Sequence, residues 1–136
     1  FAVPAVLGFN LFARAAVYMT TTRPLPVKVK KGLLAPYNSW KNRIATLKFV
    51  QDIPIDETDP SHAMVKQVDL RLAQLNDRQL LLLWGTHDFV FDLSFYNEFK
   101  QRFPKARSCV FNCAGHYLFE DCPEETAACI RRFLKS

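Results

Sequence analysis

Glycine is scarce in this sequence of 136 residues, which contains four glycines: Gly8, Gly32, Gly85 and Gly115. Their spacing excludes the nucleotide-binding patterns G-x-G-x-x-G and G-x-x-x-x-G-K-[ST]. It also excludes G-x-S-x-G, the tight turn that exposes a nucleophilic serine. A glycine-rich phosphate loop and a serine turn of that kind therefore cannot be built from this chain.

Long unbroken hydrophobic runs are also missing. The apolar stretch of residues 1–19 is interrupted by Pro4, Gly8, Asn10 and Arg14, which excludes a membrane span. It also lacks the basic start and cleavage site of a signal peptide. Because the sequence begins without Met inside this stretch, we expect it to be cut from a longer protein. The apolar residues recur at helical spacing and predict a core or lid helix: Phe9, Phe12, Ala13, Ala16 and Val17.

Nucleic-acid-binding patterns are absent despite a formal net charge of +5 and an isoelectric point near 9.2. The basic residues Lys28, Lys30 and Lys31 form a short cluster, but no aromatic stacking motif, Cys/His finger or basic helix accompanies them. A solvated charged face accounts for this cluster. We therefore expect no nucleic-acid partner.

Four cysteines lie close to the carboxyl terminus: Cys109, Cys113, Cys122 and Cys129. With His116 they form the spacing C-x3-C-x2-H-x5-C, which matches none of the common zinc patterns. The ordinary core composition, with 49% hydrophobic residues, does not require disulfides for stability. We expect reduced thiols in a cytoplasmic protein, with no metal and no cofactor.

Residues 1–77 show no alternation of strands and helices and are punctuated by prolines. One helix is predicted from Asn38 or Ser39 to about residue 50, ending before Pro54. Another is predicted to open at Pro60 or Ser61. The apolar side of this second helix comprises Met64, Val65, Val68, Leu72 and Leu75.

From residue 79 onward the pattern changes. A short apolar run ended by Gly85 indicates a buried parallel strand, although periodicity alone also allows a buried helix segment. A helix stripe follows and stops before Pro104, and residues 108–111 form a second apolar strand. Pro123 then opens a last helix, whose predicted buried side comprises Ala127, Ile130, Phe133 and Leu134. The fold class is α/β, with two parallel strands joined by a helix.

An acid and a histidine follow the two predicted strands. Asp88 comes just after the first strand and His116 just after the second, so both loops emerge at the same edge of the sheet. The Asp88 carboxylate can accept the N–H of one imidazole nitrogen and leave the other nitrogen free as a base. Asp92 is better explained as the N-cap of the following helix. His87 and His62 are expected to be exposed.

These residues lie in motifs that resemble the α/β-hydrolase family. The segment LLWGTHDFVF at residues 82–91 is similar to the strand and loop that bear the catalytic acid in that family. The segment AGHYLFED at residues 114–121, with PEE at 123–125, is similar to the histidine turn and last helix. The resemblance covers residues 79–134. It implies that Asp88 and His116 are the acid and the base of a nucleophile–acid–histidine triad.

Residues 1–77 resemble the helical cap of the same family, followed by its carboxyl-terminal core at residues 78–136. The segment PYNSW at residues 36–40, with Arg43, and the segment FVQDIP at residues 49–54 are similar to haloalkane-dehalogenase-like members. This resemblance implies a lid over the site. Trp40 and Phe49 are the expected substrate contacts.

The nucleophile of the family pattern is missing from this sequence. It should precede the acid, but Ser39, Ser61 and Ser94 lack flanking glycines and Cys113 lies between acid and histidine. We expect it upstream, in an amino-terminal half that is the main partner of this otherwise inactive chain. The resemblance implies a small apolar substrate: a haloalkane or epoxide with an Asp nucleophile, an ester with Ser. The alternative is a truncated, non-catalytic relative that acts as a binding or interaction module, and an oligomer is compatible with either hypothesis.

Overall fold

The computed structural model describes residues 3–135, which fall into two compact units. The first unit contains Phe1–Val17 and Pro26–Gln74, and the second contains Tyr18–Leu25 and Leu75–Ser136. The segment Tyr18–Leu25 thus belongs to the second unit, while the division of the chain after residue 77 stays a prediction. Among residues 3–135, no helix combines the length and the apolar character that crossing a membrane requires.

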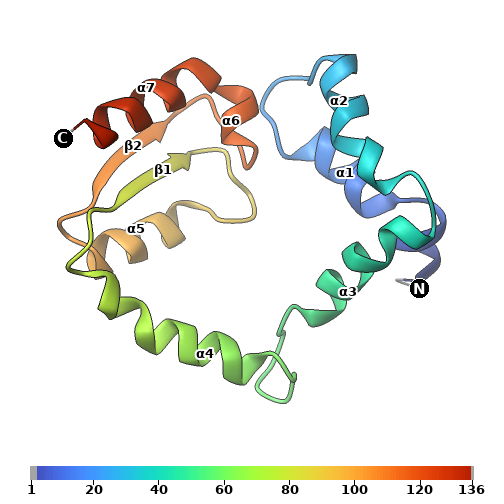
Figure 1. Ribbon diagram of the computed structural model, residues 1–136, viewed down its shortest axis with the longest axis horizontal. Coiled ribbons are helices and arrows are strands. Elements are labelled where there is room, and N and C mark those ends of the chain that lie inside the picture. The colour runs from blue at the N-terminus through green and yellow to red at the C-terminus, as the bar shows by residue number, and fades with distance from the viewer. Residues whose placement is uncertain (1–2, 136) are drawn as a thin grey trace. The chain divides into compact units, whose positions relative to one another are not determined.

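The second unit is built on two parallel strands, β1 (Leu81–Gly85) and β2 (Arg107–Phe111). Helix α5 (Leu93–Arg102) connects them, and the short helix α6 (Leu118–Asp121) and helix α7 (Pro123–Leu134) follow β2 (Figure 1). The predicted α/β order of strand, helix, strand and helix is confirmed.

Local signals start the helices of this unit. The Asp92 carboxylate accepts the Ser94 N–H at 2.8 Å and caps α5, as predicted. Helix α7 begins at Pro123, where the missing N–H costs nothing. Glu124 and Glu125 occupy its first turn, where negative charge complements the helix dipole.

The loop after β2 is part of the core of the second unit. Ala114, which is 0% exposed, forms a buried cluster with Leu118 and Cys122. Leu83 of β1 and Phe111 of β2 pack against this cluster. The segment that carries His116 is therefore held by apolar contacts with both strands.

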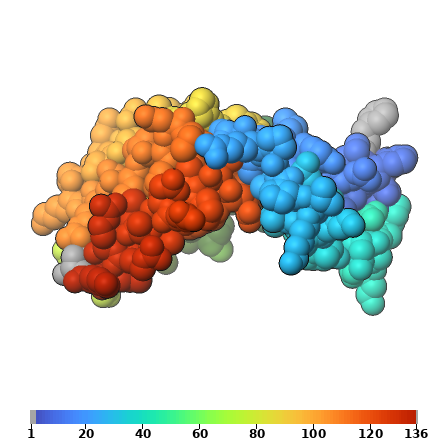
Figure 2. All heavy atoms as spheres, turned by 90° about the horizontal axis from the view of Figure 1, so that it is seen from above, coloured from blue at the N-terminus to red at the C-terminus, as the bar shows by residue number. Residues whose placement is uncertain are grey.

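Helix α7 packs against both strands and exposes much of its surface (Figure 2). Its buried residues are Thr126 and Cys129. The predicted burial of Leu134 is wrong, because this last residue of the helix is 75% exposed. Side chains in a terminal turn have fewer neighbours to cover them than side chains in mid-helix.

A disulfide between Cys109 and Cys129 joins β2 to α7, with a Cα–Cα distance of 6.8 Å. The expectation of reduced thiols is therefore wrong for this pair. The residues are 20 positions apart in sequence, and packing of α7 on the strand brings them together. Cys113 and Cys122 are free thiols, as expected. The cytoplasmic location stays a prediction.

The first unit is helical and lacks strands among its described residues. Its principal helices are α1 (Leu11–Met19, whose last two residues belong to the second unit), α2 (Val27–Leu34), α3 (Ile44–Asp52) and α4 (His62–Arg71). Shorter turns of helix lie between and around them: η1 (Pro4–Gly8), η2 (Ala35–Tyr37), η3 (Lys41–Arg43) and η4 (Leu72–Leu75). The predicted helix after Ser61 is confirmed. The helix predicted from Asn38 or Ser39 begins later, at Ile44, and ends before Pro54 as expected. The helix predicted up to residue 19 is divided into η1 and α1, and two residues of its predicted apolar face, Phe9 and Phe12, are 69% and 43% exposed.

A small core and one arginine hold η1 against α3 and its flanking turns. Val6, Leu7 and Leu47 form the buried apolar cluster. The Arg43 guanidinium donates to the carbonyl oxygens of Leu7 at 2.6 Å and Tyr37 at 2.8 Å. A cation bonded to several carbonyls satisfies the open carbonyls of two turns at once.

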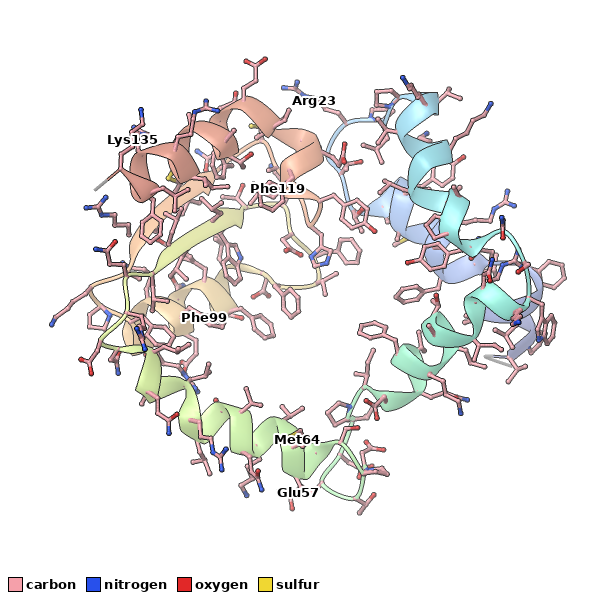
Figure 3. All side chains as sticks on the ribbon, in the orientation of Figure 1. Arg23, Glu57, Met64, Phe99, Phe119 and Lys135 are labelled. Carbon is pink, nitrogen blue, oxygen red and sulfur yellow. A yellow bond between two sulfur atoms is a disulfide. The ribbon has the colours of Figure 1, made fainter. Side chains whose placement is uncertain are left out.

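The predicted apolar side of α4 is not buried within its unit. Met64, Val65 and Val68 are 64%, 51% and 54% exposed, and no residue of α4 is buried (Figure 3). The helical periodicity was therefore sufficient to predict the helix. It did not indicate what covers its apolar side.

Candidate active site

The loops that follow the two strands meet at one edge of the sheet. Gly85 pairs with Phe111 at the carboxyl ends of β1 and β2. Beyond this pair, the N–H of Thr86 donates to the Phe111 carbonyl and the N–H of His87 donates to the Ala114 carbonyl, both at 3.0 Å. These bonds extend the pairing past the strands and bring the Asp88 and His116 loops together.

Gly85 is required by the close approach of these loops. A Cβ at this position would lie 2.4 Å from the Ala114 carbonyl oxygen and 2.6 Å from that of Gly115. Both atoms belong to backbone that is buried and cannot move aside easily. The glycine after Trp84 is therefore a packing requirement of the site.

Asp88 contacts the His116 ring, as the sequence predicts. The Nδ1 atom of His116 lies 2.9 Å from Oδ2 and 3.1 Å from Oδ1 of Asp88. The carboxylate side chain is 11% exposed and the imidazole 28% exposed. A carboxylate accepts the proton of Nδ1–H, which selects the tautomer with an unprotonated Nε2.

The Asp88 carboxylate is itself held in place by its own loop. Its Oδ1 accepts the N–H groups of Val90 at 2.8 Å and Phe91 at 2.9 Å. The Trp84 indole N–H donates to the Phe91 carbonyl at 2.8 Å and ties this loop back to β1. Because two backbone donors orient the carboxylate, it presents a fixed face to the imidazole.

Two aromatic rings flank the His116 imidazole. Phe91 lies 5.6 Å and Tyr117 lies 6.0 Å from it, measured between ring centroids. Within the described part of the chain, Nε2 of His116 has no hydrogen-bond partner. This nitrogen is the one available for proton transfer to a bound group.

A cavity of about 230 Å³ opens beside the acid and the histidine. Apart from Asp88 and His116, its lining is mainly apolar: Leu83, Trp84, Gly85, Phe91, Gly115, Leu118 and Phe119 (Figure 3 labels Phe119). An apolar cavity with one convergent polar pair is typical of a site for a small, largely apolar ligand.

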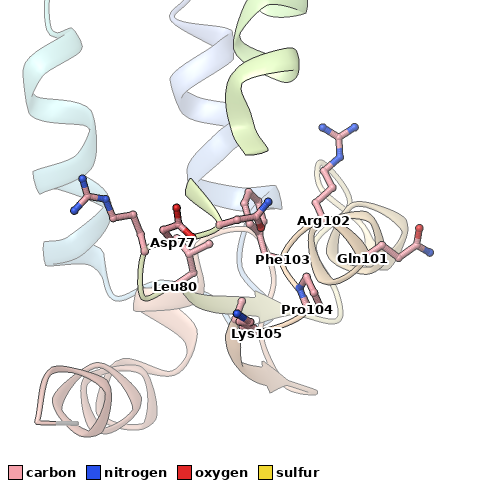
Figure 4. Close-up of a pocket in the computed structure, with 10 residues that line it drawn as sticks. Asp77, Leu80, Gln101, Arg102, Phe103, Pro104 and Lys105 are labelled. Atoms are coloured by element: carbon pink, nitrogen blue, oxygen red, sulfur yellow. The ribbon is translucent and has the colours of Figure 1, made fainter. Parts of the chain in front are cut away.

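A larger cavity, of about 410 Å³, lies at the other end of the strands, beside the residues that precede them (Figure 4). Its charged lining comprises Asp77, Arg78, Arg102 and Lys105, and Arg102 pairs with Glu98 at 2.6 Å. It contains no histidine or cysteine, and its residues do not form an acid–base pair like that of Asp88 and His116.

The protein family follows from comparison with known sequences. A family model described as alpha/beta hydrolase fold matches residues 26–123. This chain belongs to the α/β-hydrolase family. The motifs around Asp88 and His116, recognised in the sequence as similar to this family, lie within the matched residues.

Two curated relatives carry the name cis-3-alkyl-4-alkyloxetan-2-one decarboxylase. The protein from Xanthomonas campestris pv. campestris is 35% identical over 127 residues, which are 93% of this α/β-hydrolase chain and 42% of the relative. The protein from Shewanella oneidensis is 37% identical over 130 residues, covering 95% of this chain and 41% of the relative. The chain thus spans less than half the length of these relatives.

Solved structures of haloalkane dehalogenases show the same fold. The M1 loop variant of DbeA from Bradyrhizobium elkanii matches with a TM-score of 0.86 and 22% identity, covering 98% of this chain and 44% of that enzyme. DatA from Agrobacterium tumefaciens C58 matches with a TM-score of 0.81 and 20% identity, covering 98% and 46%. The α/β-hydrolase chain corresponds to the carboxyl-terminal portion of such enzymes.

The remaining residues singled out in the sequence have other surroundings in this α/β-hydrolase chain. His87 is exposed, as expected, whereas His62 is half-buried and lies in the first unit. Trp40 and Phe49 also belong to the first unit and are 54% and 59% exposed, with Phe49 packed edge-on against Phe12. Their role as substrate contacts stays a prediction. Among residues 3–135, no three or more His, Cys, Asp or Glu residues are grouped as metal ligands.

Asp121 is a site residue that sequence reasoning missed. Its carboxylate accepts the N–H of Gly115 at 2.8 Å, directly before His116, and the N–H of Thr22 at 3.0 Å. The N–H of Tyr117 donates to the Thr20 carbonyl at 2.9 Å, and the Thr22 hydroxyl donates to the Cys113 carbonyl at 2.6 Å. Hydrogen bonds thus join the turn that carries His116 to Thr20 and Thr22. The only signal in the sequence was that Asp121 closes the histidine motif.

Proposed function

We propose that this chain supplies the acid and the base of a nucleophile–acid–histidine triad in an α/β-hydrolase enzyme. The observation that carries the proposal is the contact of 2.9 Å between His116 and an Asp88 carboxylate that two backbone N–H groups already orient. The nucleophile is assigned to residues outside this chain, since its serines lack flanking glycines and Cys113 follows the acid. The amino-terminal half is thus the partner that completes the enzyme.

In this proposal His116 acts through Nε2. With Nδ1–H held by Asp88, Nε2 takes a proton from the attacking group or from the water that cleaves a covalent ester intermediate. The imidazolium that forms is stabilised by the adjacent carboxylate, which is only 11% exposed and is therefore weakly screened by water. Both residues lie in the lining of the same cavity, where a substrate can reach Nε2.

The substrate class that we propose is a small apolar molecule with an ester, epoxide or carbon–halogen bond. The names of the two curated relatives favour an oxetan-2-one with alkyl substituents, which is a four-membered cyclic ester. The mainly apolar lining of the cavity suits the alkyl groups, and the histidine suits proton transfer at the ring. In the first unit, Trp40 and Phe49 are the proposed contacts for the apolar part of the substrate.

The test is an assay of the full-length protein with a cis-3,4-dialkyl oxetan-2-one and, separately, with a haloalkane. Decarboxylation converts the ring into an alkene and CO₂ without consuming water, whereas hydrolysis adds water and gives a hydroxy acid. Either product from the cyclic ester, lost on His116→Ala in a folded protein, supports the triad. Halide release from the haloalkane would instead identify haloalkanes as the substrate class.

The same assay can also contradict the proposal that the protein is an enzyme. A full-length protein that binds these compounds without turning any of them over would contradict the proposal. That result would support the alternative of a non-catalytic binding module. Unchanged turnover in His116→Ala would remove this histidine from its proposed role.

A further inference from the structure

Two free thiols lie at the ends of the loop that carries His116. The Sγ atoms of Cys113 and Cys122 are 3.0 Å apart, although the residues are nine positions apart in sequence. Cys113 is exposed, and Cys122 is 2% exposed within the core of the second unit. Cys109 and Cys129, the other two cysteines of the chain, are already joined to each other.

The two sulfur atoms are close to bonding distance. An S–S bond is about 2.05 Å long, so the two sulfur atoms, 3.0 Å apart, have to approach by about 1 Å. Cys122 precedes α7 and packs against Ala114 and Leu118, so its position is well defined. Cys113 lies in the loop after β2 and is the more adjustable partner.

We propose that Cys113 and Cys122 are a modification site: they form a reversible disulfide by thiol–disulfide exchange with a small disulfide such as oxidised glutathione. The bond joins the two ends of the loop that carries His116. This inference goes beyond the proposed function. It depends on the proposed function only in treating the loop that carries His116 as part of an active site. Formation of the disulfide itself requires no turnover.

The exchange runs in two balanced steps. The thiolate of Cys113 attacks one sulfur of the small disulfide, breaks its S–S bond and releases one small thiolate, which takes up a proton. The thiol of Cys122 then loses its proton and attacks the Cys113 sulfur of the mixed disulfide, expelling the second small thiol. The two protein thiols are oxidised by two electrons, and the small disulfide is reduced to two thiols.

The surroundings of the two thiols assign their order of reaction. Cys113 is exposed and can meet a small disulfide from solution. Burial, together with the neighbouring Cys113 thiol, raises the pKa of Cys122 to about 11, so this thiol is poorly reactive toward reagents in solution. It is nevertheless in direct contact with Cys113 and therefore suited to the second, intramolecular step.

The disulfide would further restrict the loop that carries His116, whose position hydrogen bonds already stabilise. The Cys113 carbonyl accepts the Thr22 hydroxyl, and Asp121, next to Cys122, accepts the N–H of Gly115. A covalent link between the loop ends reduces the openings of this loop in the folded state and the freedom of the unfolded chain. We therefore expect slower amide hydrogen exchange in residues 112–123 of the oxidised protein.

The experiment uses the full-length protein equilibrated over a series of reduced-to-oxidised glutathione ratios. Acid quenching, thiol alkylation and peptide mapping by mass spectrometry then identify each cysteine pair. The expected result is a peptide pair linked by Cys113 and Cys122 in oxidising buffer, lost again in reducing buffer, while the bond between Cys109 and Cys129 is mapped in parallel. Hydrogen exchange of residues 112–123 should slow in the same samples.

Cys113→Ser is the informative variant, because the exposed position tolerates serine without a change in the core. In this variant Cys122 should remain an unmodified thiol at every glutathione ratio, since the solvent-facing partner is gone. Three outcomes would overturn the proposal: Cys113 ending as a stable glutathione adduct, Cys113 paired with Cys109 or Cys129, or both thiols alkylated throughout. All of these are read from masses, so loss of activity in the assay above is a separate result.

Discussion

The Nδ1 atom of His116 lies 2.9 Å from Oδ2 of Asp88, although 28 positions of sequence separate the two residues. The contact exists because β1 and β2 are parallel and end together, which brings the loops after them to one edge. The same carboxylate accepts two backbone N–H groups of its own loop. The protein's own backbone therefore positions this carboxylate.

The substitution Asp88→Asn should separate positioning from charge. The side-chain carbonyl of the introduced asparagine can still accept the N–H groups of Val90 and Phe91, so the free energy of unfolding should change little. The imidazole loses its charged partner and can adopt the wrong tautomer, and for the proposed activity we expect kcat of the full-length protein to fall about 10⁴-fold. Steady-state kinetics and urea unfolding of the same protein check both parts. A variant with undiminished kcat would contradict the assigned role.

Replacing Asp92 by Ala should affect stability and spare activity. Hydrogen bonds from the Ser94 hydroxyl and then from its N–H lower the pKa of Asp92 below the ordinary value of 3.8. The stabilising contribution is therefore fully present above this value and is lost as the pH falls through the lower pKa of the folded state. Urea unfolding should show a stability difference from wild type that is constant near neutral pH and shrinks below about pH 4. Asp92→Asn, which keeps the cap without the charge, is the control and should lose this pH dependence.

Gly85→Ala should damage the site through packing alone. The new Cβ would lie 2.4 Å from the Ala114 carbonyl oxygen, and we expect the free energy of unfolding to fall by about 1–3 kcal/mol. Activity should fall as well, because the His116 loop is displaced. Gly32→Ala is the matched control, since a Cβ in that helical position meets nothing within 4 Å. That variant should be as stable as wild type or more stable by up to about 1 kcal/mol. Equal stability of the two variants in urea unfolding would contradict the prediction.

Asp121→Asn should loosen the histidine turn. The side-chain amide of the introduced asparagine has one acceptor oxygen for the N–H groups of Gly115 and Thr22, where the carboxylate has two. We expect the free energy of unfolding to fall by about 1–3 kcal/mol. Amide hydrogen exchange at Gly115 and Thr22 should accelerate more than at amides of β1, which reports loosening of this turn specifically. Glu120→Gln is the control, because this neighbouring carboxylate is exposed. Similar exchange in the two variants would remove Asp121 from its positioning role.

Trp40→Ala and Phe49→Ala test the proposed substrate contacts in the first unit. If these side chains bind the apolar part of the substrate, KM should rise at least about 10-fold, while kcat should change less. Ile55→Ala is the control, because this residue is 90% exposed and no role is assigned to it. KM values that stay at the wild-type level in both aromatic variants would limit these residues to packing within their own unit.

Much of the second unit could be predicted because its signals are local. An apolar run ended by Gly85, the capping residue Asp92 and the helix start at Pro123 each act over a few neighbouring positions. The two strands then require, by the geometry of a parallel pair, that Asp88 and His116 share one edge. The sequence by itself therefore determined the α/β order, the starts of α5 and α7, and the acid–histidine pair.

The tertiary structure alone decided what holds that pair. Asp121 reaches Thr22 across 99 positions, Cys109 of β2 is bonded to Cys129 of α7 across 20 positions, and Gly85 faces the Ala114 carbonyl. No periodicity or capping signal encodes these contacts, because each depends on how elements pack after they have formed. The exposure of the apolar side of α4 was likewise not predictable, because it also depends on how the elements pack. Periodicity predicts which side of a helix is apolar, but only packing decides whether that side is covered.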